Sequence, residues 1–209
     1  MSDTGQWGKL FVFAAPSGAG KTTLVHAVVR KHQERLRFSI SYTTRQPRRN
    51  EADGVDYLFV SKERFMKLRD EGEMLEFAKV FDNFYATSRS QVEKHLADGY
   101  DVILEIDWQG ARQVRESMPE CVSIFILPPS VEELERRLRD RRTDSAEVID
   151  RRLRDSLSDM AHWDEFDYVI INDDLNQAVA DLEAVLAGNG EASATSNVAL
   201  RRAVTRIIG

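Results

Sequence analysis

The sequence predicts an α/β protein with a three-layer core, in which helices cover both faces of a parallel sheet. Four short apolar runs support this fold: 10–15 (LFVFAA), 102–106 (VILEI), 122–127 (VSIFIL) and 168–171 (YVII). Each run is nearly continuous and mostly β-branched or aromatic, which is typical of parallel strands buried on both faces. A weaker fifth run covers 37–41 (RFSIS). Amphipathic helical stretches lie between several of these runs, as a parallel sheet requires.

Capping boxes mark the expected starts of three helices. In this pattern a serine, threonine or aspartate precedes a glutamate or glutamine by three residues, so that each side chain satisfies a free backbone N–H of the first turn. The pairs are Ser130 with Glu133, Ser88 with Gln91, and Asp144 with Glu147. A last core helix is expected in 174–188 (DLNQAVADLEAVLAG).

The chain of 209 residues is long enough for one domain with sub-lobes. We expect this domain to span 8–188, with 41–99 as an insert that is richer in charge and in aromatic residues. After it, we expect a flexible linker at 189–197 (NGEASATSN) and a short amphipathic helix that completes the segment 189–209. The core is expected in 8–40, 100–130 and 156–188.

Composition narrows the class of protein. The net charge of −6 gives no global attraction to nucleic acid or to anionic membranes. No apolar run approaches the ~20 residues of a membrane helix, and the first residues have no signal-peptide pattern. The single Cys121 lies in an apolar run and is expected to be buried, and the four histidines lack metal-ligand spacing. A cytoplasmic protein without structural metal, and with neither nucleic-acid nor membrane partners, is expected.

A phosphate-binding loop is indicated at 15–22 (APSGAGKT), between the first apolar run and an amphipathic stretch. The pattern corresponds to GxxxxGK[ST], with Ala15 in place of the first glycine. Gly18 and Gly20 supply a tight backbone whose N–H groups converge on phosphate oxygens at a helix N-terminus. The alternative is a glycine-rich turn without a ligand. The strand–loop–helix context favours a nucleoside-triphosphate site and a P-loop NTPase fold.

Two residues at the end of the loop carry the chemistry of this site. Lys21 can reach the β- and γ-phosphates, and Thr22 can bind Mg²⁺ through its hydroxyl. The ATP-binding residues expected in the loop are Ala15, Pro16, Ser17, Gly18, Ala19, Gly20, Lys21 and Thr22.

A second segment indicates whether the nucleoside triphosphate serves a switch protein, an ATPase motor or a kinase. The chain has no guanine-reading NKxD motif of a switch protein, and it is short for an ATPase motor. A kinase needs an acceptor site, and 39–57 has the right composition: Arg45 and Arg48 flank a stiff Pro47, and Tyr57 follows. Two guanidinium forks and a hydroxyl suit a phosphate monoester. The alternative for an isolated arginine cluster is a solvated basic loop.

Seven stretches occur together in one order: APSGAGKT, SYTTRQPR, GVDYLFV, LEFAKVFDNFYATS, LEIDWQGARQV, IFILPPSVEELERRL and IINDDL. With them the chain resembles guanylate kinases, which phosphorylate GMP with ATP, and in particular the compact bacterial members. The resemblance runs from about Leu10 to Leu186. It implies that the insert 41–99 binds GMP and that 131–155 forms a helical lid.

The resemblance also implies roles for individual residues. The phosphate of GMP is expected at Arg45, Arg48, Tyr57 and Tyr85, and its guanine at Ser41, Glu76 and Thr87. Guanine presents two adjacent donors, N1–H and the N2 amino group, and one carboxylate can accept both. Adenine lacks these donors, so AMP would leave the carboxylate unpaired. Asp107 is expected near GMP, and Asn172 near adenine or, alternatively, at a helix cap.

Two acidic residues lie on one face at the end of this predicted strand, Glu105 within the run 102–106 and Asp107 directly after it. Glu105 and Asp107 lie where phosphate-loop enzymes place carboxylates that assist Mg²⁺, typically through water. Many relatives have aspartate at the position of Glu105. We therefore expect Mg²⁺ as the cofactor, with Thr22 as the direct ligand and both carboxylates as water-mediated ones. A second departure from the family is Ala86, where relatives usually have glycine.

The segment 131–155 holds eight arginines and eight acidic residues, so it is neutral and does not suit nucleic acid. One interpretation is a solvent-exposed helix pair with many ion pairs. The other is a lid that closes over ATP and brings cations to the transferred phosphoryl group. By resemblance the catalytic residues are Lys21 together with Arg137, Arg141 and Arg152. Relatives usually have glycine where this chain has Arg142.

The sequence therefore predicts an ATP:GMP phosphotransferase that makes ADP and GDP from ATP and GMP or dGMP. Transfer is expected to be in line, with Mg²⁺ and without a covalent intermediate, and to be essential for recycling GMP and supplying precursors of GTP and dGTP. One alternative is a binding module that has lost catalysis, which the intact Lys21 and Thr22 disfavour. Another is a phosphate-loop kinase with a different acceptor.

Overall fold

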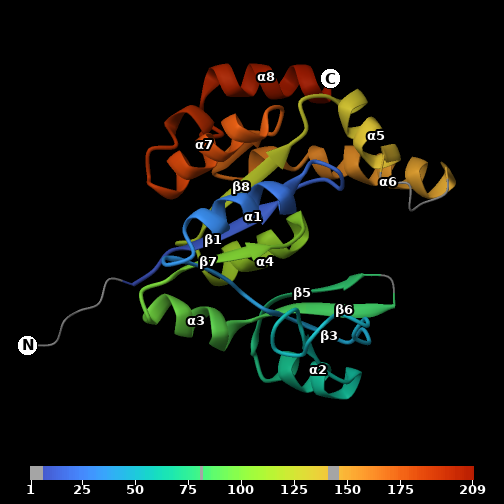
Figure 1. The fold of residues 1–209 in the computed structure, drawn as a ribbon, viewed down its shortest axis with the longest axis vertical. Coiled ribbons are helices and arrows are strands. Elements are labelled where there is room, and N and C mark those ends of the chain that lie inside the picture. The colour runs from blue at the N-terminus through green and yellow to red at the C-terminus, as the bar shows by residue number, and fades with distance from the viewer. Residues whose placement is uncertain (1–6, 81, 141–145) are drawn as a thin grey trace, which may run out of the picture. The chain divides into compact units, whose positions relative to one another are not determined.

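The computed structural model describes residues 7–80, 82–140 and 146–209 of the chain (Figure 1). Strands and helices alternate through most of it, with two 3₁₀ helices near the C-terminal end. In chain order the elements are β1 Leu10–Ala14, α1 Lys21–Lys31, β2 Leu36–Phe38, β3 Ser41–Thr43, β4 Leu58–Phe59, α2 Lys62–Asp70, β5 Met74–Val80, β6 Asn83–Ser88, α3 Arg89–Ala97, β7 Asp101–Glu105, α4 Trp108–Ser117, β8 Val122–Leu127, α5 Val131–Asp140, α6 Ala146–Met160, η1 Trp163–Glu165, β9 Tyr168–Ile171, α7 Leu175–Leu186, η2 Glu191–Ser193 and α8 Val198–Ile208.

The chain forms two compact units. Unit 1 comprises Met1–Val12, Glu34–Leu104 and Gln109–Cys121, and unit 2 comprises Phe13–Gln33, Glu105–Trp108 and Val122–Gly209. Each unit has its own buried side chains and its own set of predicted site residues.

A five-stranded sheet in the order β2-β7-β1-β8-β9 confirms the α/β fold predicted from the apolar runs. β2 and β7 pair in parallel with Leu36 opposite Asp101, and β8 and β9 pair in parallel with Ile124 opposite Tyr168. The four strong runs form β1, β7, β8 and β9. The prediction of a single strand at 37–41 is wrong, because these residues are divided between β2 of this sheet and β3 of another.

The second sheet belongs to unit 1 and has the order β4-β3-β6-β5. Helix α2 covers it (Figure 1). The side chains of Phe65, Leu68, Met74 and Ala86 form a buried cluster. Ala86 lies within β6 and pairs with residues of both β3 and β5. It therefore has the extended backbone that any residue adopts, and the missing glycine requires no special conformation.

Two helices of unit 1, α2 and α4, were not predicted. Helix α2 is capped by Ser61, whose hydroxyl accepts a hydrogen bond from the N–H of Arg64, so its start lacks the glutamate or glutamine of a capping box. On α4, the Gln113 side-chain amide accepts from the N–H of Phe77 at 3.1 Å and donates to its carbonyl at 3.2 Å. This pairing satisfies backbone groups of β5, which lies at the edge of its sheet.

The described helix caps follow the sequence pattern. The Ser130 hydroxyl accepts from the N–H of Glu133 at 3.1 Å, and that of Ser88 accepts from Gln91 at 3.2 Å. Asp174 caps α7 in the same way. Asp144, the third predicted cap, lies outside the described residues.

The composition also led to expectations about Cys121 and about membrane-spanning helices. Cys121 is a buried free thiol, as expected from its apolar run. Within 7–80, 82–140 and 146–209, no helix combines the length and the apolar content that a bilayer crossing needs.

The structure differs from the predicted flexible linker at 189–197. This segment contains η2, and Ala194 forms a β-bridge with Tyr168. Gly190 packs so closely that a Cβ there would lie 2.7 Å from the Val185 side chain. The small residues that suggested a linker thus permit close packing.

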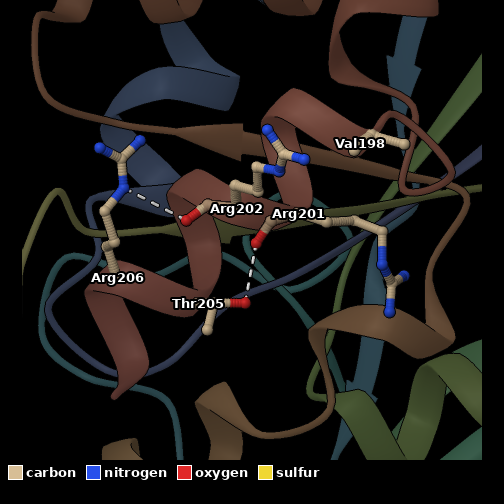
Figure 2. A pocket seen from close by; sticks show the side chains of 5 residues that line it. All are labelled: Val198, Arg201, Arg202, Thr205 and Arg206. Carbon is tan, nitrogen blue, oxygen red and sulfur yellow. Dashed lines mark hydrogen bonds between the residues drawn. The ribbon is translucent and has the colours of Figure 1, made fainter.

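The predicted C-terminal helix is present as α8. Val204 on one side of it is buried, and the opposite side is exposed. Figure 2 shows the side chains that line an open hollow on that exposed side: Val198, Arg201, Arg202, Thr205 and Arg206. No predicted site residue of the described chain is among them.

The buried cluster of the small sheet gives the first prediction. Phe65 is fully buried and its ring lies 5.4 Å from that of Phe84. Replacing Phe65 by Ala removes most of this apolar contact and should lower the free energy of unfolding by about 3–5 kcal/mol in urea titrations. Val55, which is 70% exposed, offers a matched control, since Val55→Ala should change it by less than about 0.5 kcal/mol. Equal stability of the two variants would contradict the assigned core.

Candidate active site

The loop between β1 and α1 has the backbone that a phosphate site needs. Gly18 and Gly20 adopt positive φ angles of 92° and 88°, which glycine reaches without steric cost. The N–H of Ala19 donates to the carbonyl of Pro16, and α1 begins at Lys21 directly after Gly20. The free N–H groups of the first helical turn make this end of α1 a favourable place for an anion.

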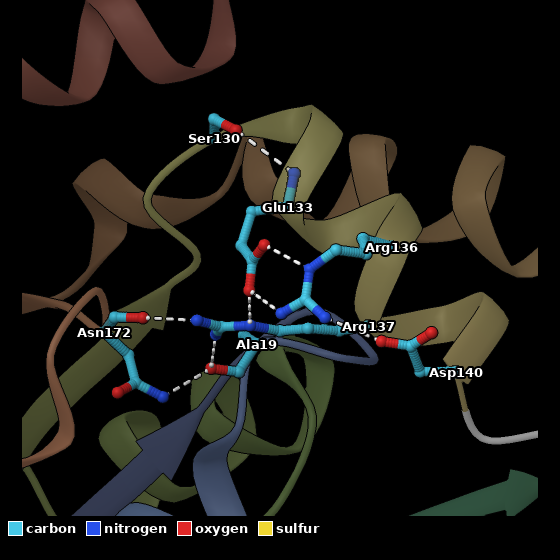
Figure 3. Close-up of polar contacts among 7 residues, drawn as sticks. All are labelled: Ala19, Ser130, Glu133, Arg136, Arg137, Asp140 and Asn172. Carbon is cyan, nitrogen blue, oxygen red and sulfur yellow. Dashed lines mark hydrogen bonds and ion pairs between the residues drawn. The ribbon is translucent and has the colours of Figure 1, made fainter.

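The carbonyl oxygen of Ala19 is held by two side chains from other parts of unit 2. Asn172, which follows β9, donates its side-chain amide to this oxygen at 2.8 Å. Arg137 of α5 donates to the same oxygen at 3.4 Å and to the carbonyl of Asn172 at 3.0 Å (Figure 3). Asn172 is buried, so its contact with the loop is shielded from water.

Arg137 is itself oriented by Glu133, which lies one turn earlier on α5 and accepts from its Nε at 2.7 Å (Figure 3). Glu133 also accepts from Arg136, and the two guanidinium groups lower the pKa of Glu133 to about 2, with Arg136 the larger cause. The carboxylate is therefore ionised at neutral pH.

Lys21 and Thr22 extend from the loop toward the end of β7. The Lys21 ammonium donates to the carbonyl of Ile106 at 2.8 Å, and the Thr22 hydroxyl donates to Glu105 Oε2 at 3.0 Å. Burial lowers the pKa of Lys21, whereas the carboxylates of Glu105 and Asp107 act to raise it. The four side chains predicted to serve phosphate and metal thus lie in one electrostatic cluster.

The residues of this cluster fit a hard cation. Glu105 Oε1 is buried without a hydrogen-bond partner, and His26 Nε2 lies 3.5 Å from it. Carboxylate and hydroxyl oxygens are the ligands that Mg²⁺ prefers, and Mg²⁺ usually keeps several waters and takes few protein ligands. In the described ranges no three His, Cys, Asp or Glu side chains gather into a dedicated metal cage.

Helix α6 contacts the loop through a residue that the sequence analysis missed. The Ser156 hydroxyl, which is fully buried, donates to the carbonyl of Ser17 at 3.1 Å. Arg152 lies one turn earlier on the same helix and is partly exposed. Arg141 and Arg142 lie outside the described residues. A buried serine at helical spacing from Ile149 and Leu153 was the available sequence signal.

In unit 1, three predicted residues form one row across three strands. Thr87 of β6 lies opposite Ser41 of β3 on one side and Glu76 of β5 on the other. The Thr87 hydroxyl donates to Glu76 Oε1 at 2.7 Å. Glu76 is only 5% exposed, which is rare for a glutamate unless its oxygens are paired. The row presents a buried carboxylate with hydroxyl groups beside it.

A second group of predicted residues gathers next to Arg45. The Arg45 guanidinium lies 5.3 Å from the ring centre of Tyr57, and the rings of Tyr57 and Tyr85 are 6.1 Å apart. Arg48 is exposed, and its backbone N–H donates to Glu51. The structure thus brings Arg45, Tyr57 and Tyr85 together, while the Arg48 side chain faces solvent.

Glu51 is a second residue that the sequence analysis missed. It accepts two parallel hydrogen bonds from Arg45, each of 2.9 Å, which is the geometry that guanidinium and carboxylate groups favour. Arg45 is the larger cause of the lowered pKa of Glu51, and Glu51 in turn raises that of Arg45. A carboxylate directly after an arginine-rich stretch was the signal for this ion pair.

The contact between Asn172 and the loop gives the second prediction. Asn172→Asp replaces the donating amide by a carboxylate that would face the Ala19 carbonyl in a buried site. We expect the free energy of unfolding to fall by about 3 kcal/mol, measured by urea titration. Asp174→Asn is the matched control, because asparagine caps α7 as well as aspartate and should cost less than about 0.5 kcal/mol. A fully stable Asn172→Asp variant would show that the amide does not hold the loop.

Known proteins resemble this chain along most of its length. The family model "Guanylate kinase" matches residues 7–189. A guanylate kinase of Alkalilimnicola ehrlichii is 54% identical over 182 residues, covering 87% of this chain and 89% of the relative. One of Pseudomonas fluorescens is 47% identical and covers 97% and 98% of the two chains. A crystal structure of guanylate kinase from Anaplasma phagocytophilum covers both chains completely, with 34% identity and a TM-score of 0.69. The chain belongs to the guanylate kinase family and is a nucleoside monophosphate kinase.

Proposed function

We propose that this chain transfers the γ-phosphate of ATP to GMP or dGMP, with Mg²⁺, and releases ADP and GDP or dGDP. The transfer is in line and needs no covalent intermediate. The reaction is essential for recycling GMP and for supplying precursors of GTP and dGTP, and its proposed location is the cytoplasm. The observation that carries the choice of acceptor is the buried carboxylate of Glu76 in the row with Ser41 and Thr87.

Glu76 supports guanine as the base. One oxygen of the Glu76 carboxylate accepts a hydrogen bond from the Thr87 hydroxyl. The carboxylate oxygens have further lone pairs that can accept from the N1–H and N2 donors of guanine. AMP would bring no donor to this position, so a buried charge would stay unpaired. Sites built to hydrogen-bond a substrate reject the analogue that lacks the group by about 10⁴-fold.

Arg45, Tyr57 and Tyr85 support a clamp for the phosphate of GMP. Two guanidinium N–H groups of Arg45 bond to Glu51, which fixes the plane of the fork and leaves further donors for an anion. The exposed Arg48 side chain is the proposed mobile member of this clamp, which closes on the substrate when it binds.

The loop 15–20, with Lys21 and Thr22, is the proposed site of the ATP phosphates, with Asn172 near the adenine. Thr22 directly, and Glu105 and Asp107 through water, are the residues that would hold Mg²⁺, which when bound neutralises charge on the phosphates. Arg137 and Arg152, together with Arg141, are proposed to stabilise the charge that develops during transfer. Lys21 orients the phosphates as a fixed cation at the start of α1.

The proposal is tested by ADP release from ATP with purified protein, offering GMP, dGMP, AMP, CMP and UMP in parallel. Turnover confined to GMP and dGMP, and lost when EDTA removes divalent metal, is the expected result; Mg²⁺ should restore it. Turnover with AMP at a similar kcat/KM would overturn the guanine assignment. ADP release without an acceptor would indicate an NTPase, and GMP binding without turnover would indicate a binding module.

The ion pair of Arg45 and Glu51 gives a third prediction. Glu51→Gln removes the charge that holds the Arg45 fork, so the fork is no longer preorganised for phosphate. We expect KM for GMP to rise about tenfold, with kcat at saturating GMP and KM for ATP nearly unchanged, which corresponds to about 1.4 kcal/mol of lost binding.

Glu71→Gln is the control for this prediction. Glu71 is exposed and its ion pairs with Arg64 and Lys67 are long, at 3.9 and 3.7 Å, so its replacement should leave KM for GMP unchanged. If Glu51→Gln and Glu71→Gln behave alike, Glu51 does not position the clamp.

A further inference from the structure

We propose that Trp108, together with Asp159 and His162, is a positioning group that fixes the C-terminal end of helix α6 beside the end of β7, and thereby sets the geometry of the phosphate loop. This inference rests on the proposed binding of ATP at that loop. All of the residues that carry it belong to unit 2.

The contacts of Trp108 are specific in geometry. Its indole N–H donates to Asp159 Oδ1 at 3.0 Å. Its ring is stacked on that of His162, with centroids 3.5 Å apart and an angle of 13° between the planes. His162 is held in turn, since its Nδ1 lies 2.6 Å from Glu165 Oε1. Trp108 is therefore fixed in position by one hydrogen bond and one aromatic stack.

The surroundings of the Asp159 carboxylate favour a hydrogen-bond donor directed at it. Burial raises the pKa of Asp159, and the nearby carboxylates of Asp107 and Asp155 act in the same direction, whereas the indole N–H opposes the rise. A partly buried carboxylate among like charges is unfavourable unless a donor is directed at it. Trp108 supplies that donor from the residue that directly follows Asp107.

Helix α6 transmits this position to the phosphate loop. Ser156 lies three residues before Asp159, so both side chains lie on neighbouring positions of one helix face. Ser156 donates to the carbonyl of Ser17 in the loop, and Arg152 lies one further turn back. The end of α6 is thus attached to the loop by Ser156 and to Trp108, the first residue of α4, by Asp159. Freeing Asp159 would let this end of the helix shift relative to the loop.

The test compares Trp108→Phe with the wild-type chain. Phenylalanine keeps an aromatic ring for His162 but removes the N–H donor of Asp159. We expect Kd for ATP with Mg²⁺, measured by calorimetry, to rise about tenfold, and kcat to fall by a similar factor, with Kd for GMP unchanged within twofold. A role confined to stability would change neither nucleotide selectively.

Two further variants keep the test independent of folding. Asp159→Asn keeps a side-chain oxygen for the indole and should bind ATP within about threefold of wild type, whereas Asp159→Ala should resemble Trp108→Phe. Ser123→Ala is the matched control, because it removes the hydroxyl that donates to Asp167 Oδ2 and accepts from the Asp167 N–H, in the same unit and away from these residues. It should lower stability but leave Kd for ATP unchanged.

The outcomes separate this inference from the proposed function. Wild-type ATP affinity and kcat in both Trp108→Phe and Asp159→Ala would overturn the positioning role, as would an equal loss of ATP and GMP binding. Tight ATP binding by the wild-type chain without transfer to GMP would overturn the proposed function, while the comparison of ATP affinities would still test the role of Trp108.

Discussion

The shape of the loop between β1 and α1 depends on one backbone atom, the carbonyl oxygen of Ala19. The phosphate loop has two positive φ angles and few internal hydrogen bonds, so its shape must be imposed from outside. Asn172 and Arg137 impose it at this oxygen, and Ser156 does so at the carbonyl of Ser17. Three segments that are distant in sequence are thereby brought to one loop. Backbone N–H groups can form a phosphate site only when the loop that carries them has a fixed shape. Hydrogen bonds to the carbonyl groups of the same loop fix that shape.

The small sheet of unit 1 meets a related constraint with side chains. Burying the carboxylate of Glu76 is costly unless donors surround it, and the pairing of β5 with β6 places the Thr87 hydroxyl directly opposite it. The register of the strands therefore decides whether this carboxylate is tolerated. A shift of one residue would turn Glu76 to the other face and leave Thr87 without its acceptor.

Local signals predicted the elements whose formation is decided locally. The runs that became β1, β7, β8 and β9 are apolar throughout, and Ser130 and Ser88 cap helices through contacts only three residues away. The signals failed where distant packing decides. The pairing of β2 with β7 ends at Phe38, opposite Ile103, and the pairing of β3 with β6 includes Ser41, so the run 37–41 is split between two sheets. The residues around Gly190 resemble a linker in composition, yet they pack against Val185 and Tyr168.

The candidate site shows the same division. The loop 15–22 could be recognised because its residues are contiguous, and the row of Ser41, Glu76 and Thr87 could be named only through the resemblance to a family. Glu51 and Ser156 were missed, because neither has a pattern of its own; each matters through a partner that the fold supplies. Contiguous residues form a recognisable motif, whereas residues that act through a partner supplied by the fold leave only a local composition.

Three cations of the candidate site share a property that bears on how it would bind phosphate. Lys21 donates to a backbone carbonyl, Arg137 to two carbonyls and to Glu133, and Arg45 to Glu51. Each is already hydrogen-bonded, so a phosphate that arrives must share or replace these bonds, and the net gain in energy per contact is small. The benefit is orientation, because side chains held in place lose little entropy when the ligand binds. A phosphotransferase gains more from this arrangement than a tight binder would, since dipoles and charges fixed beforehand stabilise the transition state without reorganising.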